Sequence, residues 1–289
     1  MKHYWVFTFL ILLVQPHCMM AQVKTEFHKE ISFINHLVSR NSYQEALYLL
    51  EKLETEIPQQ KDSLNYLSGW ILYNQKALEA STFYLRQVST QSPHYAKSNF
   101  FAAYNLSYLN RTNESLSLLA NFDTLVLPVQ KSMVNFQKAG ISLLDRRLDD
   151  FSGYADSFQG SYSVMAREEE RLKGYHINLL ERPKKSPVVA GLLSATIPGL
   201  GKMYAGKSSE GISSLLYVGA MMATSLDFYN RMGPQNPFFI ISASITSIFY
   251  IGNIWGSVTS VNRIKQEFDY EIDQRILLDM HIPLRNLFP

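Results

Sequence analysis

The feature that most constrains this chain is a run of 25 residues, 237–261, that contains no charged side chain. A helix of that length spans the hydrocarbon core of a bilayer with some tilt. A second apolar run, 211–226, reaches spanning length only if residues 227–229 lie at the membrane interface. A third run, 188–197, predicts either half a span or a full span that continues through the glycines behind it. The C-terminal half therefore predicts a membrane hairpin or a three-helix membrane unit.

The segment SATIPGLGKMYAGKSSEG, residues 194–211, interrupts these apolar runs. It is not a phosphate-binding loop, because a Walker A motif requires glycine at Thr196 and serine or threonine at Met203. A dinucleotide-binding motif fails as well, since it requires glycine at Tyr204 and a preceding strand. Irregular backbone at membrane depth survives only where protein or water satisfies its polar groups. We therefore expect this segment to be packed against other helices or to lie at the membrane surface.

The residue types of this interruption suit a membrane turn. The Pro-Gly pair at 198–199 ends a helix, and Gly201 allows a neighbouring backbone to approach closely. Tyr204 is expected at the membrane interface, where Lys202 and Lys207 reach lipid headgroups. The membrane-loop motif predicted here consists of Pro198, Gly199, Gly201, Lys202, Tyr204 and Gly206.

The stretch KKSPVVAGLLSATIPGLGKMYAGKSSEGISSLL resembles the two-transmembrane-helix domain family. The family pattern has basic residues, a small-rich apolar run, P-G-x-G, an aromatic-x-G and then G-I before another apolar run. The matching residues are Lys184, Lys185, Pro198, Gly199, Gly201, Tyr204, Gly206, Gly211 and Ile212. The chain departs from the pattern at Met203 and in carrying a further long apolar segment. The resemblance implies membrane residence, and the family has no established enzymatic activity.

Small and polar residues recur at helical spacing within the two long apolar runs. Gly252 with Gly256, and Gly219 with Ala223, form small-xxx-small pairs, so we expect close helix packing there. One face of the later run carries polar side chains, namely Ser242, Thr246, Tyr250, Asn253 and Ser257. These side chains either line a polar pathway or headgroup site, or hydrogen-bond between helices. The second interpretation is favoured, because the face carries no acidic residue and no proton-relay partner.

In the N-terminal half, prolines and small residues recur with a period of about 35 residues. A small residue precedes each of the first two prolines at the same interval, and a glycine lies further upstream of the second. We expect small residues where antiparallel helices cross, and prolines where one helical pair ends and the next begins. The positions concerned are Ala46, Pro58, Gly69, Ser81, Pro93 and Pro128.

This pattern resembles the tetratricopeptide repeat, which stacks helical pairs of about 34 residues into a solenoid. In the third unit, Tyr104 stands at the place of the glycine and Leu116 at the place of the small residue. A fourth unit around 139–140 lacks the proline, and residues 163–181 predict a closing helix. The resemblance implies a surface that binds a protein partner. A helical spacer without a ligand is the alternative.

The N-terminal segment 1–21 has the character of an export signal, with a basic start, an apolar core at 5–14 and Ala21 at the cleavage point. An uncleaved anchor and a lipoprotein signal at Cys18 are the alternatives. Cleavage after Ala21 removes the single cysteine, and with it disulfide and thiolate chemistry.

Composition and the scatter of polar residues exclude several classes of function. A net charge of +2 with mixed signs predicts no nucleic-acid binding. The histidines within 1–181 form no i,i+3 or i,i+4 pair, so no metal site is predicted. The acidic residues within 145–150 flank two arginines and suit a solvated connection between helices. We expect no catalytic residue, no cofactor and no metal.

The sequence as a whole predicts an all-α membrane protein of the bacterial cell envelope. Its predicted parts are a signal peptide (1–21), a helical-repeat domain with a closing helix (22–181), a basic hinge (182–187), a membrane domain (188–262) and an amphipathic C-terminal tail (263–289). The favoured function is a non-catalytic scaffold in the inner membrane, whose periplasmic repeats bind a protein partner. The alternative is a membrane component that handles lipid or a transported solute through the PGLGKMYAG loop. Three passes are expected, because they place the lysines of that loop inside.

Overall fold

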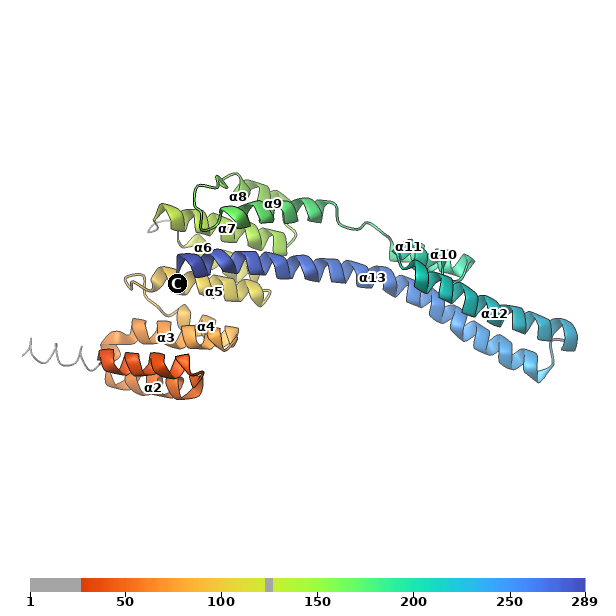
Figure 1. The fold of residues 1–289 in the computed structure, drawn as a ribbon, viewed down its shortest axis with the longest axis horizontal. Coiled ribbons are helices and arrows are strands. Elements are labelled where there is room, and N and C mark those ends of the chain that lie inside the picture. Colours follow the sequence, from red (N-terminus) through yellow and green to blue (C-terminus); the bar gives the residue numbers. More distant parts are fainter. Residues whose placement is uncertain (1–26, 123–126, 289) are drawn as a thin grey trace, which may run out of the picture. The chain divides into compact units, whose positions relative to one another are not determined.

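The computed structural model describes residues 27–122 and 127–288, and every regular element within them is helical (Figure 1). The predicted all-α class is therefore confirmed for this part of the chain. The predicted signal peptide at 1–21, with Cys18, lies outside the described residues. The chain divides into two compact units, of which the first is Met1–Glu169 together with Met280–Pro289 and the second is Glu170–Asp279.

The first unit is a series of helical pairs joined by tight turns. Its helices are residues 27–39, α2 (Tyr43–Glu56), α3 (Lys61–Asn74), α4 (Leu78–Leu85), α5 (Tyr95–Tyr108), α6 (Thr112–Ala120), α7 (Pro128–Leu144) and α8 (Leu148–Ala155). A short 3-10 turn, Pro58–Gln60, precedes α3. Helix α3 pairs with α4, α5 with α6 and α7 with α8.

One residue in the turn of each pair has a left-handed backbone, with φ between 59° and 62°. These residues are Asn41, Lys76, Asn110 and Arg146, so they recur at nearly the interval of the prolines. Asparagine is enriched in this conformation, which most side chains avoid. The prolines lie where the next pair begins, since Pro58 opens the 3-10 turn, Pro93 lies just before α5 and Pro128 is the first residue of α7. A proline at such a place loses no helical hydrogen bond.

The two helices of each pair meet at one buried residue on each helix. On the first helix this residue lies seven positions before the left-handed residue of the turn, and on the second helix it lies five positions after it. These buried residues are Ile34 and Ala46, Gly69 and Ser81, Ala103 and Ser115, and Ala139 and Phe151. Ser81 Oγ donates to the Gly69 carbonyl at 2.8 Å, and Ser115 Oγ donates to the Ala103 carbonyl at 2.7 Å. The expectation that Tyr104 and Leu116 hold these places in the third unit is wrong by one position. The reason is that the turn at Asn110 comes one position earlier than the interval of the prolines predicts.

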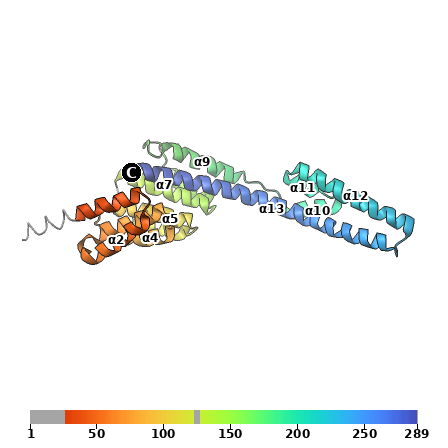
Figure 2. The same ribbon diagram turned by 60° about the horizontal axis from the view of Figure 1, so that its bottom comes forward.

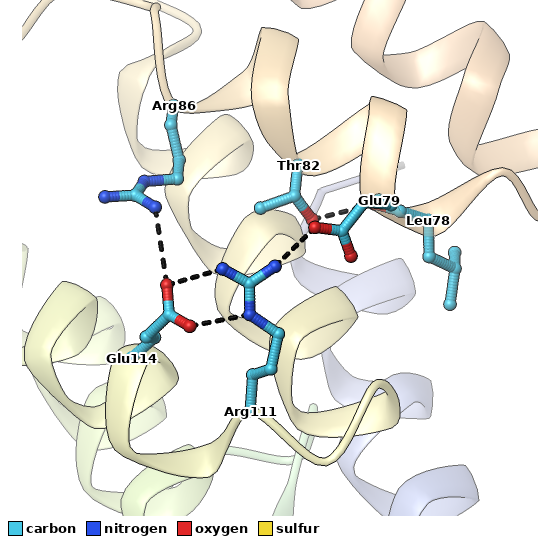
Figure 3. Close-up of polar contacts among 6 residues, drawn as sticks. All are labelled: Leu78, Glu79, Thr82, Arg86, Arg111 and Glu114. Carbon is cyan, nitrogen blue, oxygen red and sulfur yellow. Dashed lines mark hydrogen bonds and ion pairs between the residues drawn. The ribbon is translucent and has the colours of Figure 1, made fainter.

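Neighbouring pairs are linked at the surface by charged side chains (Figure 3). Arg111 binds both carboxylate oxygens of Glu114, with N···O distances of 2.6 and 2.7 Å, and also pairs with Glu79 of α4. Arg86 of α4 lies 3.9 Å from the same Glu114 carboxylate. The hydrogen bonds from Arg111 hold the pKa of Glu114 below its usual value. The network links adjoining helical pairs. Because it is exposed, it adds little stability.

The second unit holds most of α9 (Ala166–Leu180) and the apolar helices. These are α10 (Pro187–Thr196), α11 (Leu200–Ala205), α12 (Ser208–Met232) and α13 (Pro237–Leu287), whose last residues belong to the first unit. By length and composition, α12 and α13 are able to cross a membrane. Helix α10 is not, because its ten residues extend about 15 Å, half the thickness of the hydrocarbon core. The expected third pass at 188–197 therefore does not fit. Helix α13 also has no break at residue 263, where a separate tail was expected.

A buried carboxylate joins α9 to α13 inside the second unit. Asp279 is only 1% exposed, and it accepts hydrogen bonds from Arg171 Nη1 at 2.9 Å and from the Tyr175 hydroxyl at 2.7 Å. Burial and this hydrogen bond raise the pKa of Tyr175 to about 12. Arg182 of the predicted basic hinge pairs with Asp269 of α13. The hinge is thus tied to α13 at this point.

Candidate functional site

The repeat residues named from the sequence lie inside the helical pairs. Ala46 and Ser81 have no exposed surface. A Cβ on Gly69 would come within 2.6 Å of Leu85 Cγ and 3.1 Å of the Leu85 backbone nitrogen. These residues and the prolines shape the helical pairs, so a surface for recognition has to be sought on other side chains.

Aromatic and basic side chains gather on one face of α3 and one face of α5. They are Tyr66, Trp70 and Tyr73 on α3, and Lys97, Phe101 and Tyr104 on α5, in both cases at spacings of four and three. The Trp70 ring stacks on Tyr73 with centroids 5.4 Å apart, meets Phe101 edge-on at 5.0 Å and lies 4.2 Å from Lys97 Nζ. The spacing is visible in the sequence, but it is also that of any helix facing a core, so sequence reasoning missed this group.

The C-terminal segment, residues 280–288, belongs to the same unit as α5 and runs alongside it (Figure 1, Figure 2). Its side chains contact this group. The His281 ring stacks on Tyr104 with centroids 5.1 Å apart, and its Nε2 is hydrogen-bonded to the Tyr73 hydroxyl. Leu284 has no exposed surface. We call the residues of α3, α5 and α7 that contact this segment the docking face: Trp70, Tyr73, Phe100, Phe101, Tyr104, Gln137 and Gly140.

The two ends of the segment are held by different chemistry. Towards the chain end, the Arg285 guanidinium lies 5.5 Å from the Trp70 ring, which attracts cations. At its start, Gln137 Nε2 donates to the Met280 carbonyl at 2.8 Å. A Cβ on Gly140 would lie 2.5 Å from Met280 Sδ, so the glycine leaves room for the methionine in its present position against α7. The docking face therefore combines apolar contact, cation–π attraction and a backbone hydrogen bond.

Burial shifts the pKa values of several groups in and beside the docking face and its segment. It raises the pKa values of Tyr66 and Tyr73 to about 12. Burial, followed by the charge of Arg285, lowers the pKa of His281. The same two causes lower the pKa of Lys97. Near pH 7 the docking face and its segment therefore meet through neutral phenols and a neutral imidazole.

The membrane-loop motif forms a packed turn between α10 and α12. Gly199 and Gly206 have φ of 85° and 103°, values that side chains other than glycine rarely adopt. A Cβ on Gly201 would collide with the Ala190 carbonyl oxygen, and the Gly201 N–H donates to Ser194 Oγ at 3.0 Å. The Gly201 N–H is thus satisfied by a protein group, and the turn packs directly against α10.

The polar side chains of the loop also have partners in the second unit. The Tyr204 hydroxyl accepts from the Ser186 N–H at 3.1 Å, so this tyrosine holds the start of α10. Lys202 Nζ donates to Ser214 Oγ of α12 at 2.7 Å. Pro198 is half-buried between α10 and α11.

The small residues of the long helices do not pack as expected within this chain. A Cβ on Gly219 or Gly252 would meet no atom within 4 Å, and Ala223 is exposed. At Gly256 the nearest atom to such a Cβ is Lys202 Cε, at 3.4 Å. The glycine pairs therefore do not bring α12 and α13 together, because both pairs lie mostly outside the contact between these helices.

Hydrogen bonds of the polar face join α13 to α12 and to α10. Thr246 and Ser225 hydroxyls lie 3.0 Å apart, Ser257 lies 2.6 Å from Ser194, and the Tyr250 hydroxyl donates to the Ala195 carbonyl. Interhelical hydrogen bonding, the favoured interpretation of the polar face, thus describes three of its five side chains. Ser242 Oγ bonds within its own helix, to the Phe239 carbonyl at 3.0 Å.

Among the described residues, no group of three or more His, Cys, Asp or Glu side chains is placed to hold a metal ion. No family model, no curated protein and no solved structure matches the chain.

Proposed function

We propose that this chain is a non-catalytic scaffold of the bacterial cell envelope, anchored in the inner membrane by α12 and α13. Its helical-repeat domain, in the periplasm, binds a helical segment of a protein partner. The observation that supports this proposal is the docked C-terminal segment. Met280 and Leu284, four residues apart on one helix face, are fully buried there. A surface that accepts such a pair suits helix-in-groove recognition, in which apolar side chains at i and i+4 anchor the bound helix.

The contacts of the segment indicate the chemistry of the partner. Each buried anchor is followed by a side chain that meets an aromatic ring, His281 on Tyr104 and Arg285 near Trp70. A partner helix with two apolar anchors, each followed by an imidazole or basic side chain, would match the docking face. Because partner and segment use the same surface, the segment has to leave before the partner binds. The segment therefore lowers the apparent affinity of the scaffold for its partner.

The test is binding of a second copy of the segment in trans. Full-length protein carrying Leu284→Ala, which weakens the internal segment, is purified in detergent and titrated with a fluorescein-labelled peptide of residues 276–289. We expect this variant to bind the peptide about 30- to 150-fold more tightly than the wild-type protein, because the apparent affinity rises with the fraction of molecules whose docking face is free.

The matched control is the same peptide with Leu284→Ala, which should bind weakly to both proteins because it lacks an anchor. Circular dichroism checks that the variant protein keeps its helices. If a folded Leu284→Ala protein bound the intact peptide no better than wild type does, the docking face would not be a site for partner helices.

A further inference from the structure

One polar side chain in the membrane unit has no hydrogen-bond partner. Asn253 of α13 is 6% exposed, and neither its Nδ2 nor its Oδ1 is bonded to another group of the chain. The other four polar side chains of the same face are hydrogen-bonded. An amide buried among apolar groups without a partner is costly, so its presence points to a group that binds there.

Asn253 lines a recess of about 430 Å³ formed by residues of α11, α12 and α13. Beside Asn253 it is lined by Lys202 and Ser214, whose Nζ and Oγ lie 2.7 Å apart. Within the described residues, no carboxylate pairs with Lys202. The polar end of the recess therefore offers an ammonium group, a hydroxyl and an amide that both donates and accepts.

The remaining walls are formed by aromatic and aliphatic side chains and are open to the surroundings of the helices. Tyr217 is 71% exposed, Ile248 69% and Phe249 51%. These side chains belong to the two helices that are apolar enough to cross a membrane. A ligand that fills the whole recess must therefore have an anionic polar group joined to a hydrocarbon chain.

We propose that this recess binds an anionic phospholipid with a hydroxyl-bearing headgroup. The phosphate accepts hydrogen bonds from Lys202, Ser214 and the Asn253 amide nitrogen, and a headgroup hydroxyl donates to the Asn253 carbonyl oxygen. An acyl chain lies along Tyr217, Ile248 and Phe249. The site depends on the proposed insertion of α12 and α13 in a bilayer, but it is independent of the docking face and its partner.

The test uses full-length protein in dodecyl maltoside, with lipid binding followed by native mass spectrometry. The probes are phosphatidylglycerol, phosphatidylcholine with the same acyl chains, and soluble glycerol 3-phosphate. We expect wild-type protein to prefer phosphatidylglycerol over phosphatidylcholine by about ten-fold, since one is anionic and the other has no net charge. Glycerol 3-phosphate should compete poorly, because it lacks the chain that the apolar walls contact.

Three variants remove the site in different ways. Lys202→Gln and Asn253→Leu should each weaken phosphatidylglycerol binding about ten-fold, through loss of a bond to a charged group. Gly252→Leu should abolish it, because a side chain at 252 enters the recess without meeting another atom of the chain. Asn253→Leu should also melt no lower than wild type in lipid-free detergent, since it replaces an unpaired buried amide with an apolar group of similar size.

Each variant has a matched control. Lys207→Gln removes a charge from the same loop at a lysine that pairs with Glu210 at 3.4 Å. Gly219→Leu adds a side chain at another open glycine of the membrane helices, outside the recess. Both should bind phosphatidylglycerol within about two-fold of wild type, and Lys202→Arg should retain binding.

Equal binding of the two phospholipids by wild type would overturn the proposal, as would wild-type binding by Gly252→Leu or Asn253→Leu. Effective competition by glycerol 3-phosphate would show a soluble phosphate ligand, and would overturn it as well. The proposed scaffold role fails on different results, namely loss of the protein from membranes or no binding of the segment peptide.

Discussion

Removal of one anchor, Leu284→Ala, is the sharpest perturbation of the docked C-terminal segment. Leu284 has no exposed surface, although it lies only five residues from the chain end. If the segment docks as described, this side chain is a principal source of its stability. The substitution leaves α12 and the apolar part of α13 untouched, because residues 280–288 belong to the first unit.

The magnitude follows from the burial of the side chain. Truncating a fully buried leucine to alanine costs about 2–5 kcal/mol, and the upper end applies only where the cavity cannot close. The next two residues, Arg285 and Asn286, are exposed, so the segment is able to shift into the space and we expect about 2–3 kcal/mol. Since about 1.4 kcal/mol corresponds to a factor of ten, the fraction of molecules with the segment released should rise about 30- to 150-fold.

Trypsin cleavage after Arg285 measures this released fraction. The protease has to open the helix around Arg285, and its rate follows the open population when reclosing is fast. Mass spectrometry of full-length protein in detergent then reports loss of the last four residues over time. The matched control is Leu278→Ala in the same helix, at a leucine that is 56% exposed, which should change the rate little. Equal cleavage rates for wild type and both variants would refute the docking of the segment.

Four further outcomes follow from the structure. Gly69→Leu should lower the free energy of unfolding by about 1–3 kcal/mol by overpacking the crossing with α4, and an unchanged thermal melt would argue against that crossing. Gly201→Leu should reduce the amount of protein in membranes, measured by immunoblot, because its side chain collides with α10; normal levels would contradict the packed turn. Full-length protein should stay in the membrane pellet after a carbonate wash, and its recovery in the supernatant would rule out α12 and α13 as spans. Burial lowers the pKa of His281 from 6.5, so docking should hold above that pH and weaken below it, where the released segment takes up a proton first. Hydrogen exchange of residues 281–287, corrected for its intrinsic pH dependence, should therefore accelerate between pH 7 and 5.5, and a constant corrected rate would disprove the linkage.

Much of the local structure of this protein is determined by its sequence alone. The uncharged run at 237–261 requires a long apolar helix, and α13 begins at Pro237. The proline interval marks where each helical pair begins, and Gly69 and Gly201 lie where a Cβ would meet a neighbouring helix. Such features are readable because they depend on contacts between residues close in the sequence, whose spacing is set by the helix itself.

The tertiary structure decided the rest. In the third helical pair, the contact residues lie one position earlier than predicted. This shift depends on where the turn at Asn110 lies, which the spacing of the prolines does not predict. The hydrogen bond between Tyr73 and His281 joins residues 208 positions apart. The sequence pattern of the aromatic face of α3 is that of an ordinary core helix. It does not show that the C-terminal segment covers this face. Asn253 likewise lies on the same helix face as polar residues that are hydrogen-bonded, so its spacing does not distinguish it from them. Only the packing of α11 and α12 around it leaves its amide without a partner. Periodicity specifies which face of a helix is buried, whereas the partner of that face depends on how distant parts of the chain meet, which no local spacing encodes.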